Sequence, residues 1–105
     1  MCCQMNIYWL LFIIMKIKKY IQKALDTTLK SKIKKTFGEK SFVKINNVSK
    51  VRSKNSYLFN VTLYIDDIEN GLELYPDGLD VIIKQAWDMV GDKTPIIAHY
   101  SLDVP

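Results

Sequence analysis

Residues 56–65 read SYLFNVTLYI, and this stretch decides the fold. Its apolar residues alternate with the others at a period of two, which is the spacing of side chains on one face of a β-strand. One row consists of Tyr57, Phe59, Val61, Leu63 and Ile65. The alternation predicts a strand over residues 56–68 whose apolar row faces a core.

Two further segments show a strand pattern. Residues 42–51 read FVKINNVSKV, in which Val43 and Ile45 share a face and Val48 falls on the opposite parity. A bulge near Asn46-Asn47 restores the pattern. Residues 96–104 alternate again and predict a last strand at the edge of the sheet.

The segment after the central strand contains a hairpin signal. Asn70-Gly71 suits a type I′ turn, which needs positive φ at both central residues. A short strand over residues 72–75 then returns beside the central strand. The sequence Tyr75-Pro76-Asp77-Gly78 ends this pairing.

Apolar residues recur at steps of three and four in two segments, which predicts helices over residues 16–37 and 79–90. Gly38 and Gly91 follow them, where a helix commonly ends in a left-handed residue. Asp77 is a candidate N-cap for the second helix.

The element order is helix, two or three strands, helix, strand. Antiparallel strands with helices on one face form an α+β two-layer sandwich, and 105 residues suit one domain, over residues 15–105. If residues 7–14 form a strand, the order becomes βαββαβ, the ferredoxin-like arrangement.

Residues 1–14 form a separate apolar segment, with nine apolar residues in a row over 7–15. Three interpretations stay open. They are a buried strand or the start of a long helix, an interfacial membrane anchor over residues 1–19 with Cys2 and Cys3 as acylation sites, and a stretch upstream of a true start at Met15. The run is too short to cross a membrane alone, and its positive charge follows rather than precedes it, unlike a signal peptide. The two adjacent cysteines suit a reducing, intracellular setting.

Charge divides the chain into unlike halves. The net charge is +4, but residues 1–60 hold 13 Lys and Arg against two acids, and residues 61–105 hold two Lys against nine acids. The first half therefore carries +11 and the second −7. Such a split favours binding to an acidic partner or assembly with further copies.

No catalytic or metal-binding pattern emerges. His99 shares a strand face with Ser101 and Asp103, but side chains two apart on a strand stand roughly 7 Å apart, too far for a triad. The acids at 66, 67, 69 and 77 lack the ligand pattern of a calcium loop, because Ile68 offers no oxygen. The glycines are isolated, with no phosphate-binding loop. We therefore expect no enzyme, cofactor, metal or small-molecule substrate.

The sequence favours a small non-enzymatic interaction or assembly protein, with a basic N-terminal helix and an acidic C-terminal half. Its Lys/Ile/Asn-rich composition suggests a viral or phage component. The alternative is a nucleic-acid-binding module. In both cases the candidate contact residues are Lys16, Lys19, Lys23, Lys30, Lys34, Lys44, Lys50, Arg52 and Lys54.

Overall fold

The computed structural model describes residues 2–66 and 68–104, with side chains for all of these except residues 2–8 and 70. The helices and strands are, in chain order, α1 (Cys2–Asp26), α2 (Lys30–Phe37), β1 (Phe42–Val51), β2 (Ser56–Tyr64), α3 (Ile68–Gly71), α4 (Asp77–Val90) and β3 (Ile96–Asp103). Two short 3₁₀ turns, η1 (Arg52–Lys54) and η2 (Leu72–Leu74), lie between them. The architecture is mixed α+β, in the predicted order of helix, two strands, helix and strand.

The sheet has three strands in the order β1-β2-β3. β2 is antiparallel to β1 and parallel to β3. The register of β1 on β2 shifts between Ile45 and Asn47, so Asn46 is the extra residue of the predicted bulge. The bulge keeps Val43, Ile45 and Val48 buried on one face despite their mismatched parity.

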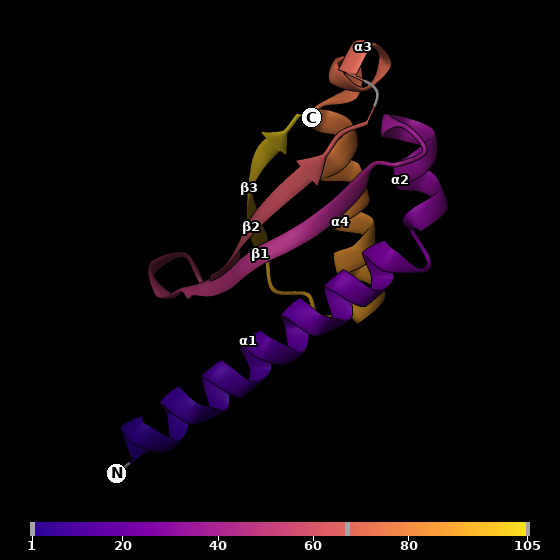
Figure 1. The fold of residues 1–105 in the computed structure, drawn as a ribbon. Coiled ribbons are helices and arrows are strands. Elements are labelled where there is room, and N and C mark those ends of the chain that lie inside the picture. Colours follow the sequence, from indigo (N-terminus) through magenta and orange to yellow (C-terminus); the bar gives the residue numbers. More distant parts are fainter. Residues whose placement is uncertain (1, 67, 105) are drawn as a thin grey trace.

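The helices cover one face of the sheet, and the core lies between the two layers (Figure 1). The predicted apolar row of Tyr57, Phe59, Val61 and Leu63 in β2, with Ile65 directly after the strand, is buried. From α4, the predicted stripe supplies Leu79, Ile82, Ile83, Ala86 and Trp87. The Trp87 ring packs edge-on against Tyr57 and Phe59, with centroids 5.7 and 5.5 Å apart.

The predicted helix over residues 16–37 is two helices, because the chain turns at residues 27–29. The Thr27 hydroxyl donates a 2.7 Å hydrogen bond to the Lys23 carbonyl, and the Leu29 N–H reaches back to the Ala24 carbonyl. Two successive threonines favour such local bonding over a regular helix. The apolar stripe continues through the turn, since Leu25, Leu29 and Ile33 are all buried.

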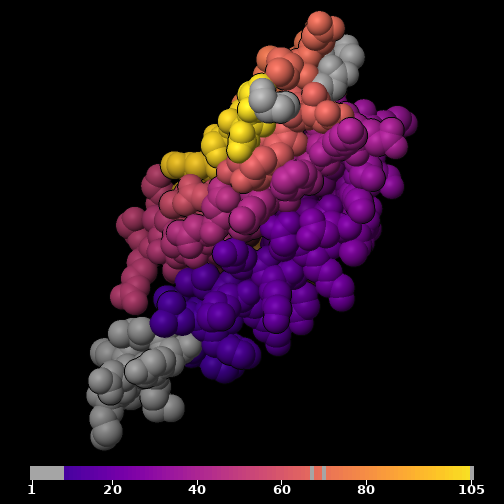
Figure 2. Space-filling model, in the orientation of Figure 1, coloured from indigo at the N-terminus to yellow at the C-terminus, as the bar shows by residue number. Residues whose placement is uncertain are grey.

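Residues 2–14 are helical and continuous with the rest of α1. The prediction of a strand over residues 7–14, and with it the ferredoxin-like order, is wrong, whereas the start of a long helix is confirmed. α1 runs past the end of the sheet, which gives the molecule an elongated outline of 54 × 24 × 23 Å (Figures 1 and 2). An uninterrupted apolar run has no period of two to favour a strand, and helix propagation from residues 16–26 extends through it.

The Asn70-Gly71 hairpin and the strand over residues 72–75 are also wrong. This segment forms α3 and η2, and Gly71 has φ −74°, which a type I′ turn does not allow. Gly71 is buried against the Ile65 side chain and the Phe37 carbonyl. Its small size is therefore used for close packing and not for a positive φ.

The ends of α4 are partly as predicted. Gly91 ends the helix with φ +81°, in agreement with a left-handed C-cap. The N-cap is Pro76, and Asp77 is the first helical residue with no side-chain capping bond. The negative charge of Asp77 still lies at the positive end of the helix dipole.

Candidate interaction surfaces

The N-terminal part of α1 exposes large apolar side chains. Trp9 is 64% exposed, Leu11 52%, Phe12 55% and Met15 71%. Ile13 and Ile14 are partly buried and pack against the core. We call residues 9–15 the apolar end of α1.

Four exposed lysines follow the apolar end within two turns of helix; this lysine collar consists of Lys16, Lys18, Lys19 and Lys23. The Lys16 ammonium lies 5.7 Å from the Phe12 ring centre and 5.9 Å from that of Tyr20. These are cation–π distances, so Lys16 joins the collar to the apolar end. The lysines of α1 have no acidic neighbour on the helix before Asp26.

The nine candidate contact residues do not form one surface. Three of them, Lys16, Lys19 and Lys23, share α1, and Lys30 and Lys34 lie on α2. Lys44 alternates with the buried Val43 and Ile45 and so lies on the sheet face opposite the helices. Arg52 and Lys54 lie in η1.

Lys50 has local contacts that account for its position. Its ammonium lies 4.6 Å from the Tyr57 ring centre and donates a 3.1 Å hydrogen bond to Asn55 Oδ1. It therefore covers the buried ring of Tyr57 at the edge of the core.

The outer edge of β1 is protected against pairing with another strand. Gln22 of α1 accepts a 2.8 Å hydrogen bond from the Ile45 N–H and donates a 3.0 Å bond to the Val43 carbonyl. The bulge at Asn46 and the charged Lys44 add two further devices that discourage edge pairing. This role of Gln22 was not predicted; its only signal in the sequence is a polar residue beside the apolar stripe of α1.

Among the described residues, the outer edge of β3 has no bulge and no side chain bound to its backbone as Gln22 is bound to β1, and its one carboxylate, Asp103, is at its end. In the part of the chain that the structure describes, β2 is its one neighbouring strand. The Pro95 and Asp103 carbonyls bond to β2, so by alternation the N–H and C=O groups of Ala98, Tyr100 and Leu102 point to the free side. Between Ile96 and Asp103 the strand has no proline, lysine or bulge. As predicted, β3 is an edge strand.

The sheet face opposite the helices carries a polar row across all three strands. Asn46 Nδ2 donates a 2.5 Å hydrogen bond to Thr62 Oγ1, which lies 2.8 Å from Ser101 Oγ. Phe42 and Tyr64 stack beside this row with centroids 4.5 Å apart. Ser101 therefore bonds across the sheet to Thr62.

One charged cluster ties α4 to β3. The Tyr100 hydroxyl donates a 2.5 Å hydrogen bond to Asp80 Oδ1, and Lys84 lies 2.9 Å from Asp80 Oδ2. The bond from Tyr100, with the help of Lys84, lowers the pKa of Asp80. Burial, followed by the neighbouring Asp80 carboxylate, raises the pKa of Tyr100. The cluster fixes the position of β3 against the helix.

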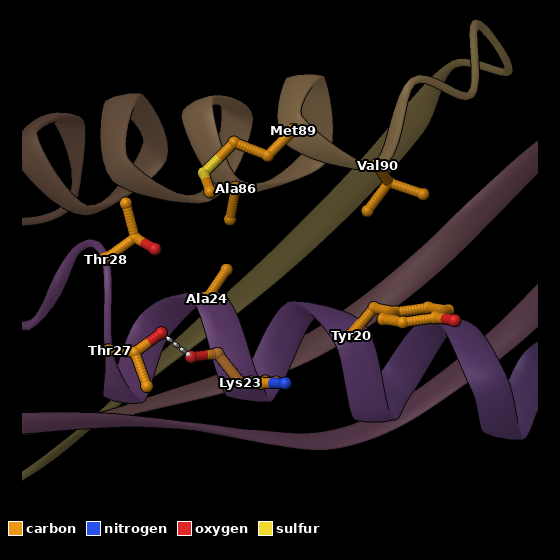
Figure 3. Close-up of a pocket in the computed structure, with 8 residues that line it drawn as sticks. All are labelled: Tyr20, Lys23, Ala24, Thr27, Thr28, Ala86, Met89 and Val90. Carbon is orange, nitrogen blue, oxygen red and sulfur yellow. Dashed lines mark hydrogen bonds between the residues drawn. The ribbon is translucent and has the colours of Figure 1, made fainter.

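A shallow groove of about 430 Å³ runs between the second half of α1 and the end of α4 (Figure 3). Ala24 and Ala86 face each other across it, and Tyr20 and Val90 lie toward one end. Lys23 is the one charged residue among its described lining.

Within residues 2–66 and 68–104, no three His, Cys, Asp or Glu residues whose side chains the structure describes come together as metal ligands. Of the acids considered for a calcium loop, Asp67 lies outside the described residues. In the same ranges no helix is long and apolar enough to cross a membrane.

The chain matches no protein-family model, and neither a curated protein nor a solved structure is significantly similar to it.

Proposed function

We propose that the protein is a non-enzymatic assembly protein that pairs through the free edge of β3 with β3 of a second copy. The observation that carries the proposal is the contrast between the two edges of one sheet. α1, through Gln22, occupies the β1 edge, whereas the backbone groups of Ala98, Tyr100 and Leu102 point to solvent from β3. Proteins commonly guard edges that are not used for pairing.

β3 is complementary to itself in an antiparallel pair. Its even-numbered residues, Ile96 to Leu102, carry the outward backbone groups and also the side chains that pack against the core. Because outward-pointing residues pair with outward-pointing residues, the apolar row of one copy lies beside that of the other. These apolar side chains are partly buried in one chain, and pairing would cover them further.

A two-fold axis through such a pair produces a closed dimer with a six-stranded sheet. The backbone hydrogen bonds supply the affinity and the alternating side chains the register. The remaining polar row, with His99 and Ser101, stays on the face opposite the helices.

Proline substitution at Ala98 tests the proposal. The Ala98 N–H points away from β2, so Ala98→Pro removes an edge donor and leaves the β2–β3 ladder intact. We expect light scattering to give twice the mass of one chain for the wild type and the mass of one chain for Ala98→Pro, with unchanged circular dichroism.

Ile97→Pro is the matched control, because the Ile97 N–H points toward β2. This substitution breaks the internal ladder and should lower the melting temperature strongly. A wild-type chain that stays monomeric at all concentrations overturns the proposal.

The nucleic-acid alternative stays a prediction, and the distribution of its nine candidate residues over both faces of the sheet gives it no additional support. The viral or phage origin and the intracellular location also stay predictions.

A further inference from the structure

The apolar end of α1 is apolar around its whole circumference. At about 100° per residue, four consecutive helical positions point to four sides. Here those positions are occupied by Trp9, Leu10, Leu11 and Phe12, and all but Leu10 are more than half exposed. A partner helix covers one stripe of a helix, whereas this segment exposes apolar groups on several sides. Helices that are apolar all round are found inside cores or membranes.

The boundary between the apolar and the charged part of α1 is perpendicular to the helix axis, because each side of the helix changes from apolar to charged at about the same point along its length. Residues seven apart lie on the same side of a helix, two turns on. Three exposed apolar residues have an exposed lysine at this spacing: Trp9 with Lys16, Leu11 with Lys18, and Phe12 with Lys19. A helix lying flat on a membrane has an apolar stripe along its length, so a transverse boundary fits insertion by the helix end.

We propose that the protein attaches to anionic phospholipid bilayers by inserting the start of α1, up to Phe12, into one leaflet, with the lysine collar at the headgroups. α1 begins at Cys2, and the eleven residues from Cys2 to Phe12 span about 16 Å at 1.5 Å per residue. This length corresponds to about one leaflet of a hydrocarbon core about 30 Å thick. Ile13 and Ile14 pack against the core, so insertion stops before them and the folded body lies at the headgroups.

The charges favour an anionic bilayer over a second copy as the occupant. All four lysines of the collar are exposed, and α1 has no acid before Asp26. A second α1 packed parallel against the same segment brings its own collar close to the first, where like charges repel. Phosphate headgroups instead pair with the ammonium groups, while the lysine stems lie along the apolar surface. Tyr20 lies among the lysines of the collar, and such amphipathic rings are enriched at membrane interfaces.

The proposal does not depend on pairing through β3. The residues of the apolar end belong to α1, whereas the Ala98 edge belongs to β3 at the far side of the sheet order from β1. Either proposal, membrane attachment or pairing through β3, can therefore be wrong while the other is right.

Vesicle flotation of the full chain tests the attachment. Vesicles of phosphatidylcholine with 30% phosphatidylserine (a fraction chosen for the assay) are compared with pure phosphatidylcholine. We expect the protein to float with the anionic vesicles and Trp9 fluorescence to shift to the blue, a shift that Trp9→Phe abolishes while Trp87 stays in the core.

Two variants separate the apolar and charged contributions. Leu11→Gln/Phe12→Gln alters exposed side chains only and should abolish flotation. Lys16→Gln/Lys19→Gln/Lys23→Gln should weaken binding to anionic vesicles roughly a hundredfold, since each lysine near a charged surface contributes about a factor of five.

Val81→Gln/Met89→Gln is the matched control, because both residues are about half exposed on α4 and outside the apolar end. It should float like the wild type. Equal loss in this control overturns the proposal. So does a wild-type chain that fails to float while its mass in solution is halved by Leu11→Gln/Phe12→Gln, which identifies a second copy as the occupant.

Discussion

The amide side chain of Gln22 takes the place of a neighbouring strand for Ile45, whose N–H it binds at 2.8 Å. The same amide donates to the Val43 carbonyl, so it satisfies one donor and one acceptor of the β1 edge. Val43 and Ile45 are both buried, and buried backbone groups need partners. Gln22 thereby fixes the position of α1 on the sheet and closes this edge.

Gln22→Ala should lower the free energy of unfolding by about 1–3 kcal/mol, because it leaves a buried N–H and C=O without partners. Urea unfolding measures the change. Gln85→Ala is the control, since Gln85 also bonds through its side chain, to Lys32, but at an exposed position; its effect should stay within about 0.5 kcal/mol. Equal losses in the two variants contradict the role given to Gln22.

Tyr100→Phe should lower the free energy of unfolding by about 1.5 kcal/mol at neutral pH through loss of the bond to the Asp80 carboxylate. The variant keeps the ring that packs on the core. Asp80→Asn, which keeps an acceptor but not the charge, should lose less. Urea titrations of the three proteins at one pH give the comparison, and no difference between wild type and Tyr100→Phe rejects the expectation.

The same cluster should make stability depend on pH at both ends of the range. Folding lowers the pKa of Asp80 from its ordinary value of 3.8, so its contribution is present above that value and is lost as the pH falls through the folded-state pKa. Folding raises the pKa of Tyr100 from 10.0, so its contribution is present below pH 10 and is lost as the pH rises through the folded-state pKa.

Melting temperatures of wild type and Tyr100→Phe between pH 2 and pH 11 measure this dependence. The difference in melting temperature between wild type and Tyr100→Phe should be constant near neutral pH and should become smaller toward pH 2. A gap of the same size at pH 2 and pH 7 contradicts the assignment to the Asp80 charge.

Gly71→Ala should destabilise the fold by about 1–3 kcal/mol, the usual range for an overfilled core. A Cβ at this position overlaps the Ile65 Cδ1 atom and lies 3.4 Å from the Phe37 carbonyl oxygen. Ile65→Val removes the overlapping methyl group, so the double variant should recover part of the loss. A double-mutant cycle by urea unfolding measures the coupling, and purely additive effects contradict the contact.

The regular part of the fold could be predicted from the sequence. Tyr57 to Ile65 alternate without interruption, and Leu79 to Val90 hold a helical period, so each pattern matches a single structure. The bulge at Asn46 followed from the parity of Val48 alone. Each of these patterns is local in the sequence, and the apolar residues that form them belong to the observed core.

The errors arose where tertiary packing decides the backbone. Asn70-Gly71 is a strong turn signal in isolation, but Gly71 is needed as a small residue beneath Ile65 and takes a helical φ. The bonds of Gln22 to β1 and of Tyr100 to Asp80 join residues 23 and 20 positions apart. No spacing rule predicts such contacts. The roles of Gln22 at the β1 edge and of Tyr100 in β3 therefore became clear only from the structure.

Because β2 is antiparallel to β1 but parallel to β3, the two strand pairs should form at different times during folding. β1 and β2 close over the short η1 turn, whereas the neighbours Thr62 and Ser101 are 39 positions apart. Short loops close faster and at lower entropic cost than long ones. The hairpin should therefore form first, with the β3-facing side of β2 uncovered until α4 packs and brings the last strand into place. During that interval the most aggregation-prone edge of the molecule is one that the finished sheet conceals.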